Sequence, residues 1–139
     1  MKYAIILVME DTTDKSTKKR IILWVEDDVM IGTILGNKLI SEGFDLIHVS
    51  TGEEAMYHLK QVTPQLIVLD LLLSGLNGMD ILRTLHKDQN LQKIPVIILS
   101  NMSKESDVEE ATALGVKKFL VKPSTSLEEI VKCVRAYCG

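Results

Sequence analysis

The chain of 139 residues is long enough for one hydrophobic core and too short for two ordinary domains. Its 46% hydrophobic and 25% charged residues exclude a disordered chain, and its net charge of −3 argues against sequence-independent binding to nucleic acid. No apolar run reaches the roughly 18 residues of a membrane span. The spacing of Cys133 and Cys138 does not suit a disulfide, which favours reduced thiols in a cytoplasmic protein.

The first part of the chain differs in composition from the rest. Residues 3–9 form a short apolar run, and residues 11–20 contain no large apolar side chain. We expect residues 1–19 to be an N-terminal appendage and linker, and residues 20–139 to form the domain. The apolar run is interpreted either as a small extra strand or as a leader upstream of the true start.

After the linker, short apolar runs alternate with amphipathic segments. Such runs, when bounded by polar residues, are typical of buried strands in a parallel sheet. The expected strands are residues 21–25, 44–49, 65–69, 95–99 and 118–121. Five strands that alternate with helices predict an α/β fold with a doubly wound five-stranded parallel sheet and helices on both faces.

The segments between the runs carry helix signals. Apolar residues recur at helical spacing, first as Ile31, Ile34, Leu35 and Leu39. Two later helices are expected to begin with capping boxes, at Thr51 with Glu54 and at Ser126 with Glu129.

Acidic residues stand directly after two of the predicted strands. Glu26, Asp27 and Asp28 follow the first strand, and Asp70 follows the third. Ligands of open α/β sheets bind beyond the carboxyl ends of the strands. Carboxylates gathered there repel one another unless a cation or a basic side chain lies among them. The pattern therefore predicts a divalent-metal site, with one carboxylate available for chemistry.

Two further polar residues occupy corresponding positions. Ser100 follows the fourth strand, and Lys122 follows the fifth. Taken singly, such residues are more often loop polarity, surface charge or a helix cap, and Asp28 is expected to be a cap. Their joint occurrence at the same edge of the sheet favours a functional site.

With this ordered set, residues 20–138 resemble the receiver domain of two-component response regulators. The matching motifs are Val25-Glu26-Asp27-Asp28, Leu69-Asp70 with Gly78, Leu99-Ser100, and Val121-Lys122-Pro123. The resemblance implies the flavodoxin-like strand order 2-1-3-4-5. It also implies a phosphoacceptor domain of a two-component or phosphorelay system, with a sensor histidine kinase or a histidine phosphotransfer protein as its partner.

The resemblance assigns a role to each site residue. Asp70 would be the phosphoacceptor, Lys122 would pair with it and then with a phosphoryl oxygen, and Ser100 would bond another phosphoryl oxygen. Mg²⁺ would be held by Asp27, by Asp70, by the main-chain carbonyl of Leu72, and by Glu26 through a water. The domain would not be an enzyme acting on a separate substrate, although it would promote its own phosphorylation and dephosphorylation.

The family also suggests how a signal would leave the site. Ser100 and Phe119 would form a switch, although Phe119 is equally well interpreted as an ordinary core residue. The output face would be the fourth helix, the fifth strand and the fifth helix, between Lys104 and about Arg135. This face allows a homodimer or an unknown downstream protein, without direct contact to nucleic acid or membrane. The Lys122–Pro123 bond is expected to be cis.

Two alternatives from other classes stay open. The chain can be a receiver-like protein-interaction module that works without phosphorylation, or a metal-dependent phosphohydrolase. The complete set of acids, Ser100 and Lys122 argues against the first. The second usually needs another acid two residues after the nucleophile, where this chain has Leu72. A flavin-binding protein is disfavoured because acids, and not a phosphate-cradling loop, follow the first strand.

Overall fold

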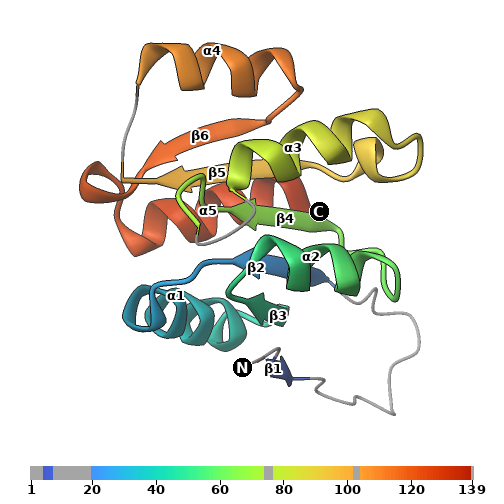
Figure 1. Cartoon of the computed structure of the whole chain (residues 1–139). Coiled ribbons are helices and arrows are strands. Elements are labelled where there is room, and N and C mark those ends of the chain that lie inside the picture. The colour runs from blue at the N-terminus through green and yellow to red at the C-terminus, as the bar shows by residue number, and fades with distance from the viewer. Residues whose placement is uncertain (1–4, 8–19, 74–76, 102–103, 139) are drawn as a thin grey trace.

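The computed structural model describes residues 5–7, 20–73, 77–101 and 104–138 (Figure 1). Their fold is an α/β sandwich around one twisted sheet. The parallel strands are β2 (Ile21–Val25), β3 (Asp45–Val49), β4 (Leu66–Leu69), β5 (Val96–Ser100) and β6 (Lys118–Val121). They lie in the order β3-β2-β4-β5-β6, which is 2-1-3-4-5 when only the parallel strands are counted. The predicted fold class and strand order are confirmed.

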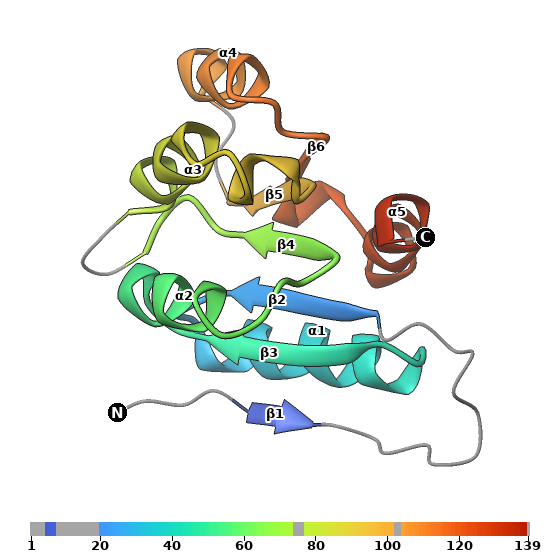
Figure 2. The ribbon, with the colours of Figure 1, turned by 90° about the vertical axis from the view of Figure 1, so that its right-hand side faces the viewer.

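A sixth strand extends the predicted sheet. Strand β1 (Ile5–Leu7) pairs antiparallel with β3, with Ile5 opposite His48 and Leu7 opposite Leu46, and it forms the edge next to β3 (Figure 2). This observation agrees with the small extra strand that was one of the two interpretations of residues 3–9. The linker expected between this strand and residue 20 lies outside the described residues.

Helices cover both faces of the sheet (Figure 2). Helices α1 (Val29–Ser41) and α5 (Leu127–Cys138) pack on one face, where Leu35, Leu39 and Val134 join Trp24 and other strand residues in a buried cluster. The other face carries α2 (Gly52–Leu59), α3 (Gly78–Lys87) and α4 (Glu105–Ala113), over a second buried cluster. Short 3₁₀ turns, η1 (Leu91–Lys93) and η2 (Lys122–Ser124), complete the elements.

The predicted helix starts are observed. The Asp28 carboxylate accepts a hydrogen bond from the Ile31 amide at 3.0 Å, so Asp28 is the N-cap of α1. At the start of α5, Ser126 Oγ accepts from the Glu129 amide at 3.1 Å, and Glu129 accepts from the Ser126 amide at 3.2 Å. The Glu54 amide likewise donates to Thr51 Oγ1 at 3.1 Å.

Strand register brings the acidic residues to one edge of the sheet. Val25 lies opposite Val49 of β3 and Leu69 of β4, so β2 and its neighbours end at the same level. The Glu26 amide then donates to the Val49 carbonyl at 3.0 Å, and the Asp70 amide donates to the Val25 carbonyl at 3.1 Å. The residues that follow β2 and β4 are therefore neighbours.

Two further expectations concern the backbone and the membrane. No cis peptide bond occurs among the described residues, so the expected cis bond at Lys122–Pro123 is not observed. Of the helices described, none has both the length and the apolar character needed to cross a bilayer.

Candidate functional site

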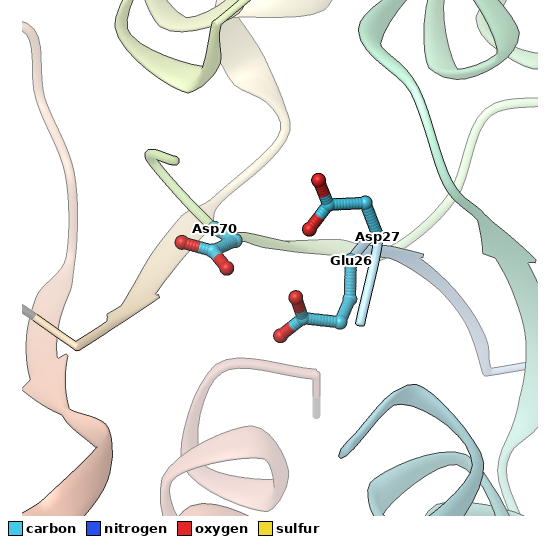
Figure 3. Close-up of side chains that lie close together, drawn as sticks. All are labelled: Glu26, Asp27 and Asp70. Carbon is cyan, nitrogen blue, oxygen red and sulfur yellow. The ribbon is translucent and has the colours of Figure 1, made fainter. Parts of the chain in front are cut away.

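Three carboxylates meet at the carboxyl edge of the sheet, as the sequence predicted (Figure 3). One ligand oxygen from each of Glu26, Asp27 and Asp70 lies within 4.8 Å of the others. Glu26 and Asp70 are buried, and Asp27 is half-buried. Three oxygen donors at this spacing can hold a cation, and hard divalent cations prefer such donors.

Lys122 supplies the basic group in this cluster. Its Nζ lies 2.8 Å from Asp70 Oδ2 and 2.5 Å from Glu26 Oε1, and its side chain is only 9% exposed. Lys122 follows β6, and β5 separates that strand from β4. Only a long side chain can reach Asp70 from there, because neighbouring strands are about 4.8 Å apart. One ammonium group among three carboxylates leaves an excess of negative charge.

Burial shapes the protonation of this cluster. It raises the pKa of Glu26 from 4.5 to about 7; the hydrogen bond from Lys122 opposes this rise, and the nearby charge of Asp70 adds to it. Burial alone would lower the pKa of Lys122, but its hydrogen bonds to Asp70 and Glu26 outweigh that effect and raise it. Lys122 is therefore protonated at neutral pH, while ionised Glu26 is costly without a further cation.

This cost predicts an unusual pH dependence of stability. Because the folded-state pKa of Glu26 is about 7 and its ordinary value is 4.5, the fold favours the protonated carboxyl. In a chelating buffer, ionisation of Glu26 should therefore remove on the order of 3 kcal/mol of stability as the pH rises from about 4.5 to 7. Urea denaturation at several pH values measures this loss.

The matched variant for that measurement is Glu26→Gln, which keeps the shape of the side chain and cannot ionise. The way in which the difference in unfolding free energy between the two proteins changes with pH reports the ionisation of Glu26 together with its effect on Lys122 and Asp70. We expect Glu26→Gln to be the more stable protein at pH 8. A difference that does not change between pH 5 and pH 8 would contradict the assigned pKa.

The main chain after Asp70 is held close to its carboxylate. The Leu72 amide donates to Asp70 Oδ1 at 3.0 Å, and the Gly78 amide donates to the Leu71 carbonyl at 3.0 Å. Leu72 itself is 54% exposed. Leu72 thus lies beside the carboxylate cluster, and the metal-binding role of its carbonyl stays a prediction.

The two predicted switch residues lie on neighbouring strands. Ser100 is the last residue of β5 and is 1% exposed. Because β5 lies between β4 and β6, Ser100 lies between Asp70 and Lys122 at the carboxyl ends of the strands. Phe119 of β6 is half-buried and packs against the core under α2, α3 and α4. Phe119 therefore has a packing role in this structure, and its second role in a switch stays a prediction.

One residue at the site was not predicted. His48 Nε2 lies 3.0 Å from the main-chain carbonyl oxygen of Glu26. This carbonyl belongs to the peptide that joins Glu26 to Asp27. No sequence signal pointed to it, because His48 lies within a strand and contacts a main-chain atom that every residue type has.

Comparison with known proteins shows similarity in sequence and in fold. The model of the response regulator receiver domain family matches residues 22–135. The DNA-binding response regulator MtrA of Mycobacterium tuberculosis is 32% identical over 120 residues, which cover 86% of this chain and 51% of MtrA. The chain thus spans about half the length of this curated relative.

Solved structures agree with the fold. The phosphorylated cyanobacterial phytochrome response regulator RcpA has a TM-score of 0.75 and 28% identity, over 86% of this chain and 91% of that one. The Mn²⁺-bound response regulator Rcp1 has a TM-score of 0.72 and 30% identity, over 84% of this chain and 90% of that one.

Proposed function

Because the chain belongs to the response regulator receiver domain family, we propose that it accepts phosphate on Asp70 from a phosphohistidine in a two-component or phosphorelay system. One observation carries the proposal: Lys122 Nζ bridges Asp70 and Glu26 at 2.8 and 2.5 Å, beside Asp27, in a buried cluster with excess negative charge. This arrangement suits a site that takes a divalent cation and a phosphoryl group together.

The proposed reaction is a phosphoryl transfer between two side chains. An Asp70 oxygen forms a bond to phosphorus while the bond from phosphorus to the donor's imidazole nitrogen breaks, and the electron pair stays with the imidazole. Lys122 would bond one phosphoryl oxygen, and the Ser100 hydroxyl would donate to another. Positioning and charge neutralisation do most of the work in such reactions.

The oxygen donors fit Mg²⁺, which prefers carboxylates and carbonyls and retains several waters. Asp27, Asp70 and the Leu72 carbonyl would hold it directly, and Glu26 would do so through a water. Bound Mg²⁺ would neutralise charge on the phosphoryl oxygens. The structural relative Rcp1 was solved with Mn²⁺, which favours similar oxygen-rich sites.

The surface beside the site supports docking of a protein donor. Val29, Met30 and Ile34 of α1 are 78%, 71% and 50% exposed, although they are apolar. Ile34 also lines a groove of about 220 Å³. It is lined by Ile31, Ile34, Leu35, Leu99, Lys122, Thr125, Leu127 and Ile130. A sensor histidine kinase or a histidine phosphotransfer protein would cover these side chains while its phosphohistidine reaches Asp70.

The remaining parts of the proposal concern output and self-catalysis. The domain would promote its own phosphorylation and dephosphorylation, and it would act in the cytoplasm. Phosphorylation would alter the face formed by α4, β6 and α5, where a downstream protein or a second copy would bind. MtrA is a DNA-binding regulator, but this chain matches only about half of it, and we propose no direct DNA contact for the domain.

A titration with beryllofluoride, which mimics a phosphoryl group, tests the proposed function. Trp24 is fully buried two residues before Glu26, so its fluorescence can report binding. We expect saturable binding with Mg²⁺, no binding without it, and no binding by Asp70→Asn. Absence of Mg²⁺-dependent binding to the folded wild-type chain would favour the phosphorylation-independent interaction module instead.

A further inference from the structure

The peptide bond between two of the predicted metal ligands is fixed by a side chain from the neighbouring strand. The paired residues of β2 and β3 end at Val25 and Val49, and the Glu26 amide adds one more main-chain bond to the Val49 carbonyl. The Glu26 carbonyl accepts from His48 Nε2 at 3.0 Å. A carbonyl only accepts hydrogen bonds, so this ring nitrogen carries the proton. Both polar groups of the Glu26 main chain are thus bonded to β3.

The imidazole ring is held in place from two other sides. A Cβ atom on Gly32 of α1 would lie 2.4 Å from His48 Cε1 and 2.6 Å from Nε2, so only glycine leaves space for the ring. The Trp24 indole stacks with the ring at a centroid distance of 6.2 Å and an interplanar angle of 24°. Trp24 Nε1 in turn donates to the Gly32 carbonyl at 3.3 Å. Gly32 of α1 and Trp24 of β2 therefore set the direction of the His48 donor.

From this geometry we infer that His48 is a positioning residue for the metal site. The carbonyl that it bonds belongs to the peptide that joins Glu26 to Asp27, so the rotation of this peptide sets where both carboxylates point. Partners behind the direct ligands typically change metal affinity by about 10- to 100-fold when they are removed. The inference rests on the proposed function, because it concerns the cation that this function requires.

Metal affinity of the folded protein separates positioning from ordinary packing. Mn²⁺ titrations followed by electron paramagnetic resonance measure free metal directly and do not depend on Trp24, which contacts His48. We expect His48→Leu, which keeps the bulk and removes the donor, to bind Mn²⁺ about 10-fold more weakly. His48→Gln, whose amide nitrogen can donate to the same carbonyl, should retain most of the affinity.

A second pair of variants reaches the same contact without changing His48. Gly32→Ala should displace the ring and weaken Mn²⁺ binding to a similar extent. The control is Gly36→Ala, one turn further along α1, where a Cβ would meet only Leu46 Cδ2 at 3.0 Å; its affinity should equal that of the wild type. In a His48→Leu background, Gly32→Ala should cause no further loss of affinity.

The outcomes distinguish this inference from the proposed function. If the wild-type chain binds Mn²⁺ but neither His48→Leu nor Gly32→Ala weakens binding, the inference is wrong and the proposed function stands. If the folded wild-type chain binds neither Mn²⁺ nor Mg²⁺, the proposed function itself fails. Urea denaturation of each variant establishes that it is folded, and Gly32→Ala provides the test if His48→Leu does not fold.

Discussion

Replacing Asp70 by asparagine should abolish phosphorylation of the chain. Asp70 Oδ2 lies 2.8 Å from Lys122 Nζ at the centre of the acidic cluster, and an amide oxygen is a far weaker nucleophile than this carboxylate. Intact-mass measurement after incubation with acetyl phosphate and Mg²⁺ should show one added phosphate on the wild-type chain and none on Asp70→Asn.

The neighbouring acids provide matched controls for that experiment. Asp28→Asn removes a charge close to the site but keeps the N-cap of α1, because asparagine caps helices as well as aspartate does. Its phosphorylation should match that of the wild type. Asp27→Asn removes an expected metal ligand and should slow phosphorylation strongly. Phosphate that persists on Asp70→Asn would show that another residue is the acceptor.

Replacing Gly78 by alanine should destabilise the fold by about 3 kcal/mol, the upper end of the usual cost of overpacking. A Cβ there would lie 2.2 Å from the Asp70 carbonyl oxygen and 2.6 Å from the Leu71 Cα. Both are main-chain atoms, so relief requires movement of the segment that carries Asp70. Urea denaturation monitored by circular dichroism measures the change.

Gly36→Ala is the control for this substitution, because it makes the same chemical change within a helix. Its Cβ would meet only the end of a leucine side chain at 3.0 Å, and alanine is the better helix former by up to about 1 kcal/mol. It should be neutral or slightly stabilising. Equal stability of both variants would mean that the main chain of Asp70 and Leu71 can move at little cost in free energy. The close contact at Gly78 would then not fix the position of Asp70.

The regular part of the fold was predictable because its strands are apolar runs with polar ends. The expected strand at residues 44–49 appears as Asp45–Val49, and that at 95–99 appears as Val96–Ser100. The short N-terminal strand could not be decided, because three residues at a sheet edge leave no periodic pattern. Its antiparallel pairing with β3 depends on a partner some 40 positions along the chain.

The site was predictable as a set of residue types and not as a set of contacts. Acids that follow β2 and β4 had to meet once the strand order was known, and the lysine after β6 had to reach across β5. The raised pKa of Glu26 depends on burial, which the sequence does not specify for one side chain at a strand end. The contact of His48 with the Glu26 carbonyl involves a main-chain acceptor, so no pairing of residue types signalled it.

The two edges of the sheet bear on how the protein behaves at high concentration. The edge strands β1 and β6 have only 3 and 4 residues, and β6 begins with the exposed Lys118. Short edge strands offer few main-chain groups to the strand of another molecule, and natural proteins use them to avoid edge-to-edge aggregation. Without β1, the 5-residue strand β3 would become an edge. The N-terminal strand therefore covers main-chain groups of β3 that would otherwise be open to a strand of another molecule.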